Sequence, residues 1–323
     1  MTIYKSVPLN FPRVLRIEPA SQCNLSCSHC PTGTVEMKRG IMREDVFERV
    51  MSEIFEHQKN IKVVVLYHGG EPLLNNSFYS MVSRIKSINN DFFIKTVSNG
   101  MALTKKHAED ILKSGIDLIE FSLDGESLKE SQYVRIHSNT KKIINNIKYL
   151  IGLKKTNNLV KPEIVISTTQ FLRNKIPTES LSEPIVPHWL KDIFKNEVSE
   201  YKPTYALKWP HMGDSGRFDF FKPTNAINKD ECDHIINTLT VRSDGAVVPC
   251  CYDLTSKLVM GNILEESLND IWNGKKYSML RDSIKSKNYR YICNSCEVVR
   301  PPIFLIPKWK TDEISLKIKK STI

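Results

Sequence analysis

Short apolar runs alternate with longer amphipathic stretches through most of this chain, and this alternation limits the folds open to it. The runs are rich in Val, Ile and Phe, which favours strands, whereas the stretches between them repeat apolar residues at helical spacing. Alternating strands and helices are typical of β-α units around a parallel sheet. We expect strands at 14–19, 61–67, 92–97, 118–123, 164–169 and 205–209.

Three of the intervening stretches show the helical period most clearly. We expect helices at 45–58, 105–114 and 140–153. The second follows a possible cap at Thr104 and ends before Gly115, a residue type that favours helix C-termini. Six β-α units are fewer than the eight of a closed TIM barrel. Periodicity alone does not separate an open barrel from a doubly wound sheet.

Composition predicts a folded protein with a sizeable core, since 41% of the 323 residues are hydrophobic. The first dozen residues contain no apolar signal-peptide core, and no stretch approaches the roughly 20 apolar residues of a membrane helix. Eight cysteines without an export signal favour the reducing cytoplasm and metal ligation over disulfides. The net charge of +10 is carried by scattered lysines, which favours a solvated surface over attraction to an anionic substrate.

Three cysteines, Cys23, Cys27 and Cys30, stand in the spacing C-x3-C-x2-C, and the next cysteine is Cys232. A structural zinc site is normally closed by four ligands, so a fourth Cys or His should lie nearby. His29 lies between two of the cysteines, where it could not easily reach the same metal as both. A [4Fe–4S] cluster usually takes four Cys, so three ligands leave one iron open for an exogenous ligand. The spacing therefore favours a cluster with an open iron over zinc.

A glycine-rich segment follows the expected strand 61–67 and reads Gly69-Gly70-Glu71-Pro72. Two consecutive glycines let the backbone turn tightly and approach a ligand closely. Together with the C-x3-C-x2-C loop, in this order and at this separation, the segment resembles the radical S-adenosylmethionine (SAM) superfamily. The resemblance implies an α/β fold, the partial (β/α)6 TIM-like barrel, and an open iron chelated by the amino and carboxylate groups of SAM. In that family the cluster passes an electron to the sulfonium, and the resulting 5′-deoxyadenosyl radical abstracts a substrate hydrogen atom.

The same resemblance implies SAM-binding residues at the carboxyl ends of the strands, where α/β barrels gather their functional residues. Gly69, Gly70 and Glu71 would bind the methionyl amino group, and His29 would pack near the adenine. Arg135 would pair with the SAM carboxylate, a role that suits a planar bidentate donor. The ribose contacts would come from Ser98, Ser122 and Asp124. By composition alone, the segments that hold these last three residues are ordinary turns.

The other five cysteines lie beyond residue 231, and their pattern predicts a second metal site. The runs 239–242 and 246–248 flank a turn sequence, which predicts a hairpin, and a helix is expected at 267–272. The pattern C-x12-G-x4-C, followed by C-x2-C, resembles the SPASM/twitch extensions of radical SAM enzymes, which hold auxiliary Fe–S clusters. The cysteines that suffice for one fully ligated [4Fe–4S] cluster are Cys232, Cys250, Cys293 and Cys296.

On the residues alone, the same four cysteines could instead close a tetrahedral zinc site. Cys251 is left over, either as a buried thiol or as an alternative ligand to Cys250. We expect the chain to divide into the barrel, residues 1–225, and a small auxiliary cluster domain, residues 226–323. This second domain should be a β-hairpin plus helix with a basic C-terminal tail.

The segment 174–228 has few regular patterns, and its part 208–217 follows the last expected strand. A long loop in this place should overhang the active site. The expected substrate contacts are His211, Asp214 and Arg217. Tyr67 and His68 flank the site, but nothing in the sequence assigns them a role.

The likeness to the twitch subgroup implies SAM-dependent oxidation of a secondary alcohol on a small, hydroxylated substrate such as an aminocyclitol or sugar. The auxiliary cluster would accept the electron, and a flavodoxin or ferredoxin would supply the reductant. The alternative is a peptide maturase that forms thioether or carbon–carbon bonds or oxidises a side chain. The first strand starts near residue 14, which leaves no room for the peptide-recognition domain that many maturases carry.

A zinc-stabilised nucleic-acid-binding protein is a third hypothesis, based on the net charge. No patch of interleaved aromatic and basic residues supports it, and it leaves the Gly-Gly-Glu-Pro segment unexplained. We therefore expect neither a nucleic-acid nor a membrane partner.

Overall fold

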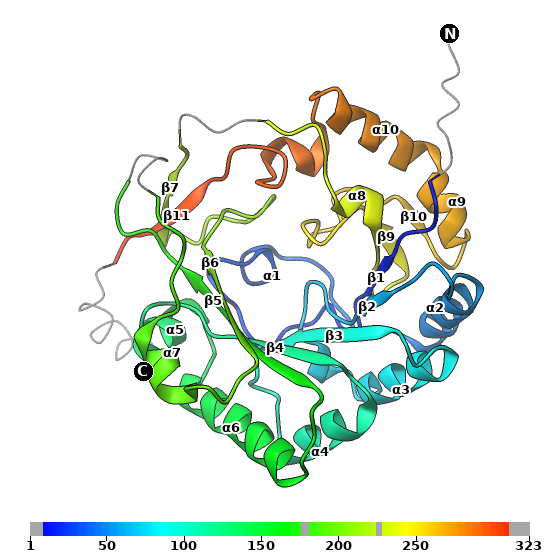
Figure 1. Cartoon of the computed structure of the whole chain (residues 1–323). Coiled ribbons are helices and arrows are strands. Elements are labelled where there is room, and N and C mark those ends of the chain that lie inside the picture. Colours follow the sequence, from blue (N-terminus) through cyan, green and yellow to red (C-terminus); the bar gives the residue numbers. More distant parts are fainter. Residues whose placement is uncertain (1–8, 176–180, 224–227, 310–323) are drawn as a thin grey trace.

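One curved sheet organises the computed structural model, which describes residues 9–175, 181–223 and 228–309. Its nine strands follow the order β10-β9-β8-β1-β2-β3-β4-β5-β6. Figure 1 shows the sheet bent into an open ring with helices on its outer side, a partial (β/α)6 TIM-like barrel. The six strands of the barrel run parallel in chain order and are β1 (Val14–Ile17), β2 (Val63–Val65), β3 (Phe93–Ser98), β4 (Leu118–Ser122), β5 (Glu163–Gln170) and β6 (Glu200–Tyr205).

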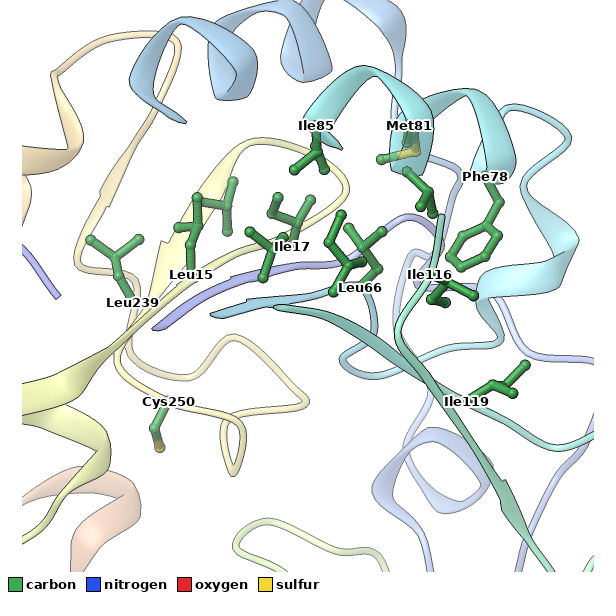
Figure 2. Close-up of a cluster of buried hydrophobic side chains, with 14 of the residues drawn as sticks. Leu15, Ile17, Leu66, Phe78, Met81, Ile85, Ile116, Ile119, Leu239 and Cys250 are labelled. Carbon is green, nitrogen blue, oxygen red and sulfur yellow. The ribbon is translucent and has the colours of Figure 1, made fainter. Parts of the chain in front are cut away.

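Amphipathic helices cover the outer face of the sheet, to which each presents an apolar side. Figure 2 shows how the layers meet: Leu15 and Ile17 of β1 face the helix layer that carries Met81 and Ile85. All four side chains are buried, so this layer boundary removes apolar surface from water. The outer helices are α2 (Glu44–Glu56), α3 (Phe78–Ile88), α4 (Lys105–Ser114) and α6 (Thr140–Thr156), with the shorter α5 (Leu128–Val134) and α7 (His188–Phe194).

Helix α4 begins and ends where the sequence predicts. The side chain of Thr104 accepts a hydrogen bond from the backbone N–H of His107 at 3.2 Å and so caps the helix. Gly115 has φ of 87°, a left-handed conformation that ends the helix at little cost for glycine. The expected helices at 45–58 and 140–153 are confirmed as α2 and α6.

The sixth strand lies earlier than the sequence predicts. The expectation at 205–209 is wrong, because β6 ends at Tyr205 and Leu207 makes an isolated bridge with Phe304. β6 is the edge strand of the sheet, and an edge tolerates Pro203, which has no N–H to donate. Its polar and partly exposed residues hid it from a search for apolar runs.

The hairpin predicted in the C-terminal region is confirmed, and it extends the barrel sheet. β8 (Thr238–Val241) pairs antiparallel with β9 (Ala246–Val248), and β10 (Gly261–Asn262) adds to β9. β8 also lies parallel to β1, so backbone hydrogen bonds join the C-terminal region to the barrel. The division of the chain after residue 225 stays a prediction. The helices of this region are α8 (His234–Asn237), α9 (Leu268–Asn273), α10 (Lys275–Lys285) and the 3-10 helix η3 (Tyr291–Ser295).

A second, two-stranded sheet pairs β7 (Phe218–Phe221) with β11 (Phe304–Pro307). Figure 1 places it beside β6, on the left of the view. The sequence does not predict it, since its two strands come from opposite sides of the C-terminal region. Among the described residues, no helix has both the length and the apolar character needed to span a membrane.

Candidate active site

A cavity of about 250 Å³ opens where the barrel strands end. The loop after β1 leads into the short helix α1 (Pro31–Thr34), which Figure 1 shows near the centre of the ring. All of the predicted cluster and SAM residues of the barrel line this one cavity. They are Cys23, Cys27, Cys30, Gly69, Gly70, Glu71, Ser98, Ser122, Asp124 and Arg135.

The cysteine loop is fixed by backbone contacts to neighbouring segments. The N–H of Ser28 donates to the carbonyl of Val134 at 2.9 Å, and the N–H of Cys30 donates to that of Cys27 at 3.2 Å. A Cβ atom at Gly33 would lie 2.4 Å from the Cys27 carbonyl oxygen, so only glycine allows α1 to pack this closely on the loop. The three thiols are thereby held on one side of the cavity, partly exposed.

The chemistry of these thiols fits a metal cluster. Burial raises the pKa of Cys27 to about 12 and also raises that of Cys23, so both stay protonated until a metal displaces the proton. Donors to one tetrahedral zinc at about 2.3 Å lie about 3.8 Å apart. Among the described residues, which include all eight cysteines, no three cysteine sulfurs lie within 4.8 Å of one another. Such wide spacing suits a multi-iron cluster, in which each thiolate binds a different iron.

The glycine-rich segment after β2 packs against the cysteine loop. A Cβ at Gly70 would meet the Ala20 carbonyl oxygen at 2.3 Å, so the second glycine is sterically required. The N–H of Gly69 donates to the buried carboxylate of Glu18 at 2.9 Å, and the Thr32 hydroxyl donates to the Gly69 carbonyl. These contacts hold the backbone of the segment against the cavity.

Glu71 crosses from this segment to the end of β3. Its carboxylate accepts hydrogen bonds from the hydroxyl of Ser98 at 2.9 Å and from the backbone N–H groups of Asn99 at 2.7 Å and Leu73 at 3.1 Å. Burial raises its pKa, and these hydrogen bonds act against that rise. The charge of Arg135 also opposes the rise, although no cation of the described residues lies within ion-pair distance of Glu71. A buried carboxylate at the cavity wall fits an ammonium group such as that of SAM.

Asp124 and Arg135 form a buried ion pair, with 2.6 Å between Arg135 Nη1 and Asp124 Oδ2. His29 Nε2 lies 3.2 Å from the same oxygen, and Thr169 N–H donates to Asp124 Oδ1 at 3.0 Å. Burial would raise the pKa of Asp124, but Arg135 and His29 hold it well below its usual range. Arg135 Nε is buried without a hydrogen-bond partner among the described residues, and this orphan donor fits the SAM carboxylate.

The assignments of Ser98, Ser122 and Asp124 to the ribose stay predictions, as does that of His29 to the adenine. All three ribose candidates line the cavity. Ser98 is engaged by Glu71, and the hydroxyl of Ser122 accepts a bond from Ser167 at 3.4 Å. His29 packs edge-on against Phe171, with 5.6 Å between ring centroids.

His68 also lines the cavity and was not assigned a role from the sequence. Its Nε2 donates to the carbonyl of Asp253 at 3.2 Å, which leaves Nδ1 unprotonated and without a partner among the described residues. Burial lowers its pKa to about 4, although the nearby Glu18 carboxylate opposes the change. The imidazole is therefore neutral near pH 7, with one buried nitrogen that can accept a proton.

The predicted substrate contacts lie on the segment after β6. Gly213 packs on α1, since its N–H donates to the Thr34 hydroxyl at 3.1 Å, so the segment does reach the cysteine loop. The three side chains themselves are not part of the cavity lining, and their role stays a prediction. Arg217 Nη1 donates to the Tyr133 carbonyl at 2.9 Å, and Asp214 accepts from Gly216 N–H at 2.8 Å. His211 is exposed.

Trp209 and Thr169 line the cavity but were not singled out from the sequence. Thr169 lies at the end of the fifth expected strand, so the rule that barrels gather functional residues at strand ends could have found it. Trp209 precedes the three predicted contacts, but the misplaced sixth strand assigned it to the sheet.

The four C-terminal cysteines predicted as ligands gather in one buried place. Cys232 precedes α8, Cys250 follows β9, Cys293 lies in η3 and Cys296 directly follows it; all four are buried. Burial raises the pKa of each, to about 12 for Cys293. Cys250, Cys293 and Cys296 each feel the charge of another thiol of the set, whereas the thiol whose charge acts on Cys232 is Cys251. The four thiols thus fit a single multi-iron centre.

Cys251 differs from these four. Its sulfur lies 3.9 Å from His234 Nε2. Burial would raise the pKa of Cys251, but His234 and Arg16 together lower it below its ordinary value. Cys251 is therefore paired with His234 and Arg16, although its charge also acts on Cys250 and Cys232 of the set of four.

Comparison with known proteins identifies both halves of this arrangement. A family model described as the radical SAM superfamily matches residues 17–169, and one described as an iron-sulfur cluster-binding domain, SPASM, matches residues 232–297. The chain is a radical SAM protein with a SPASM domain. The first domain implies a [4Fe–4S] cluster and SAM, and the second implies auxiliary iron–sulfur chemistry.

Individual relatives cover most of this radical SAM protein. The "tungsten-containing aldehyde ferredoxin oxidoreductase cofactor-modifying protein" of Pyrococcus furiosus is 25% identical over 322 residues, covering 88% of this chain and 87% of the relative. The structure of BtrN in complex with AdoMet and 2-DOIA is similar at a TM-score of 0.57 and 20% identity, covering 89% of this chain and 94% of BtrN. Streptococcus suis SuiB bound to its precursor peptide SuiA reaches 0.63 at 16% identity, covering 84% and 67%. These likenesses establish the fold.

Proposed function

We propose that this radical SAM protein is an oxidoreductase that takes a hydrogen atom from a secondary alcohol of a small hydroxylated substrate, similar to an aminocyclitol or sugar. The observation that carries the proposal is the set of four buried C-terminal cysteines. Four thiolates complete the coordination of a [4Fe–4S] cluster and leave no iron for substrate, which suits an electron acceptor. The likeness to BtrN, crystallised with AdoMet and 2-DOIA, supports a small-molecule substrate.

In this proposal the barrel residues have separate tasks. Cys23, Cys27 and Cys30 hold the first cluster, Glu71 binds the amino group of SAM, and Arg135 binds its carboxylate. When bound, the cluster and SAM supply a 5′-deoxyadenosyl radical. A flavodoxin- or ferredoxin-type protein supplies the electron that this chemistry requires.

The proposed oxidation of the alcohol to a ketone removes two electrons and two protons. One hydrogen atom would leave the carbon with one electron, and the hydroxyl proton would leave to a base. Cys232, Cys250, Cys293 and Cys296 would hold the cluster that accepts the second electron. We assign the proton to Nδ1 of His68, because this nitrogen is buried without a partner among the described residues and His68 lines the cavity. A weak base suffices if the proton leaves together with the second electron, because loss of that electron converts the hydroxyl into that of a strongly acidic protonated ketone.

Peptide modification is the second candidate function. It is favoured by the likeness to SuiB, which was crystallised with its precursor peptide. A peptide maturase would use the same hydrogen abstraction, so the two candidates differ in substrate rather than in the first chemical step.

Iron and sulfide content after anaerobic reconstitution tests the proposal. Two [4Fe–4S] clusters predict about 8 iron per chain, falling to about 4 in a Cys23→Ala, Cys27→Ala, Cys30→Ala variant. The Cys251→Ser variant is the matched control and should keep about 8 iron. If wild type binds about 4 iron and the triple variant none, the C-terminal site lacks a cluster and the oxidation loses its electron acceptor.

Substrate screening then separates the two candidate functions. Polyols that drive formation of 5′-deoxyadenosine and are recovered as ketones support the alcohol oxidation. Peptides that do so, with polyols inert, favour the maturase instead.

A further inference from the structure

A buried arginine, Arg16, lies on the inner face of β1. Residues along a strand alternate between its two faces, and Figure 2 shows its neighbours Leu15 and Ile17 on the helix side of the sheet. The Arg16 side chain therefore points to the other side, the barrel interior, where the figure also shows Cys250. Only 7% of Arg16 is exposed.

The guanidinium group of Arg16 lacks an acidic partner. Its Nε and Nη1 are buried and have no hydrogen-bond acceptor among the described residues, and no carboxylate there forms an ion pair with it. Its contacts are Tyr67, by the ring at 5.5 Å from Cζ to the centroid and by the hydroxyl, and the charges of Cys251 and Cys250. An unpaired buried charge is costly, so the charge of Arg16 must be compensated by the nearby thiols, by a ligand or by both.

Two lysines share this part of the interior. Lys95 of β3 lies two residues before Val97, so these two side chains point to the same face of the sheet. Lys202 of β6 likewise shares its face with Thr204, two residues later. Val97 lines the active-site cavity. Burial lowers the pKa of Lys95, and the neighbouring charges are those of Glu120, Lys202, Arg16 and Cys251.

Positive charge therefore exceeds negative charge inside the barrel. Lys202 engages two carboxylates, since its Nζ lies 3.4 Å from Glu200 Oε2 and 3.8 Å from Glu120 Oε2. Lys95 forms no ion pair within the described residues. We name Arg16, Lys95 and Lys202 the interior cation set.

The interior cation set lies beneath the cavity that holds the cluster and SAM residues. Tyr67, which contacts Arg16, is part of the cavity wall. Two further wall residues are Ser122, which lies two residues after Glu120, and Thr169, which pairs with Thr204 in the sheet. The three cations are not themselves part of the cavity lining, so a substrate would have to reach past these lining residues to contact them.

We propose that the interior cation set binds an oxyanion of the substrate, a carboxylate or phosphate group, so that the substrate is an acidic molecule. The inference rests on the proposed function and names the substrate class of the same site. Arg16 would provide two adjacent donors, Nε and Nη1, a geometry that matches two oxygens of one anionic group. Lys95 would add a point charge from the facing strand. The anion would then fix which carbon is presented to the SAM site.

Calorimetric titration of anions into the anaerobic, SAM-saturated holoenzyme tests this inference. The probes are inorganic phosphate and acetate at constant ionic strength, and they separate phosphate from carboxylate recognition. Of phosphate and acetate, we expect the one that wild type binds more tightly to lose about tenfold in affinity in Arg16→Gln and about threefold in Lys95→Gln. Arg16→Lys should recover part of the affinity. Arg43→Gln, a change to an exposed arginine on the outer surface, is the control and should bind as wild type.

Iron content of each variant shows whether it has folded. The reduction potential of the auxiliary cluster distinguishes anion binding by Arg16 from a role of Arg16 as counter-charge to the cysteines. If Arg16→Gln shifts that potential but leaves anion binding unchanged, Arg16 is a counter-charge to the nearby cysteines and the inference is overturned. If neither anion binds wild type while a neutral polyol drives 5′-deoxyadenosine formation, the inference fails and the proposed function stands. If anions bind as expected but no substrate yields 5′-deoxyadenosine, the anion site stands and the proposed function fails.

Discussion

The two cysteine sites of this protein differ in how they meet their surroundings. The barrel cysteines are partly exposed on a loop and border a cavity in which Arg135 Nε is an unused donor. The four C-terminal cysteines are buried between a hairpin, a helix and a 3-10 turn. The first site is arranged to admit another molecule, and the second to enclose its metal. We therefore expect loss of the first to abolish chemistry and loss of the second to abolish structure as well.

The sharpest test of this comparison is removal of each site in turn. Cys293→Ser combined with Cys296→Ser should lower stability by several kcal/mol, because a structural metal contributes its binding energy to folding. The Cys23→Ala, Cys27→Ala, Cys30→Ala variant should melt near wild type while forming no 5′-deoxyadenosine. Anaerobic thermal melts followed by circular dichroism measure the difference. Equal melting temperatures for the two variants would contradict it.

The next largest effect is expected at the ion pair beneath the open site. Arg135→Gln leaves the buried Asp124 carboxylate without its main partner, and the loss should be about 3–5 kcal/mol. Arg84→Gln removes a partly exposed pair with Glu44 and Glu48 and should change stability by about 1 kcal/mol or less. Urea denaturation of both variants checks the contrast. Comparable losses would show that the Arg135 pair contributes no more than a surface pair.

His68 should make stability depend on pH, since burial lowers its pKa from 6.5 to about 4. Below pH 6.5 the unfolded chain binds a proton at this position before the folded chain does. The stability that neutral His68 contributes is thus present above pH 6.5 and is lost as pH falls toward 4, by on the order of 3 kcal/mol.

His68→Gln removes this titration, so the stability of the variant should fall less steeply than that of wild type between pH 7 and pH 4. Urea midpoints at several pH values measure both slopes. The same variant should also slow formation of the ketone product without preventing SAM binding. Parallel slopes for the two proteins would refute the buried neutral state of His68.

The smallest effect is expected far from both sites. Thr104→Ala removes the cap of α4 and should cost about 1 kcal/mol. Because α4 lies on the outer layer, iron content and 5′-deoxyadenosine formation should match wild type. A loss of cofactor in this variant would mean that the outer helices and the sites are coupled.

Local signals explain what the sequence could predict. Thr104 and Gly115 act on their own helix, so the bounds of α4 could be read from neighbouring residues. The cysteine loop and the segment Gly69-Gly70-Glu71 are short motifs, and the structure places both on one cavity. Five of the barrel strands are buried apolar runs, which periodicity finds readily.

Contacts between distant segments explain what the sequence could not predict. β6 is polar and contains Pro203, and it is a strand only because β5 offers it an edge. The pairing of β7 with β11, and the bonds from Asp124 to both His29 and Arg135, join residues that no local pattern links. The interior position of Arg16 likewise follows from the curvature of the whole sheet.

The parallel pairing of β8 with β1 has a consequence for assembly of the chain. More than 200 residues separate β1 from its partner β8, so this pairing closes a very long loop and should form late in folding. Until then the edge of β1 is unprotected, and exposed apolar edges invite association with other chains. A barrel cut before β8 should therefore aggregate, and fragments that carry only the cysteine loop and the glycine-rich segment are poor material for isolating this enzyme.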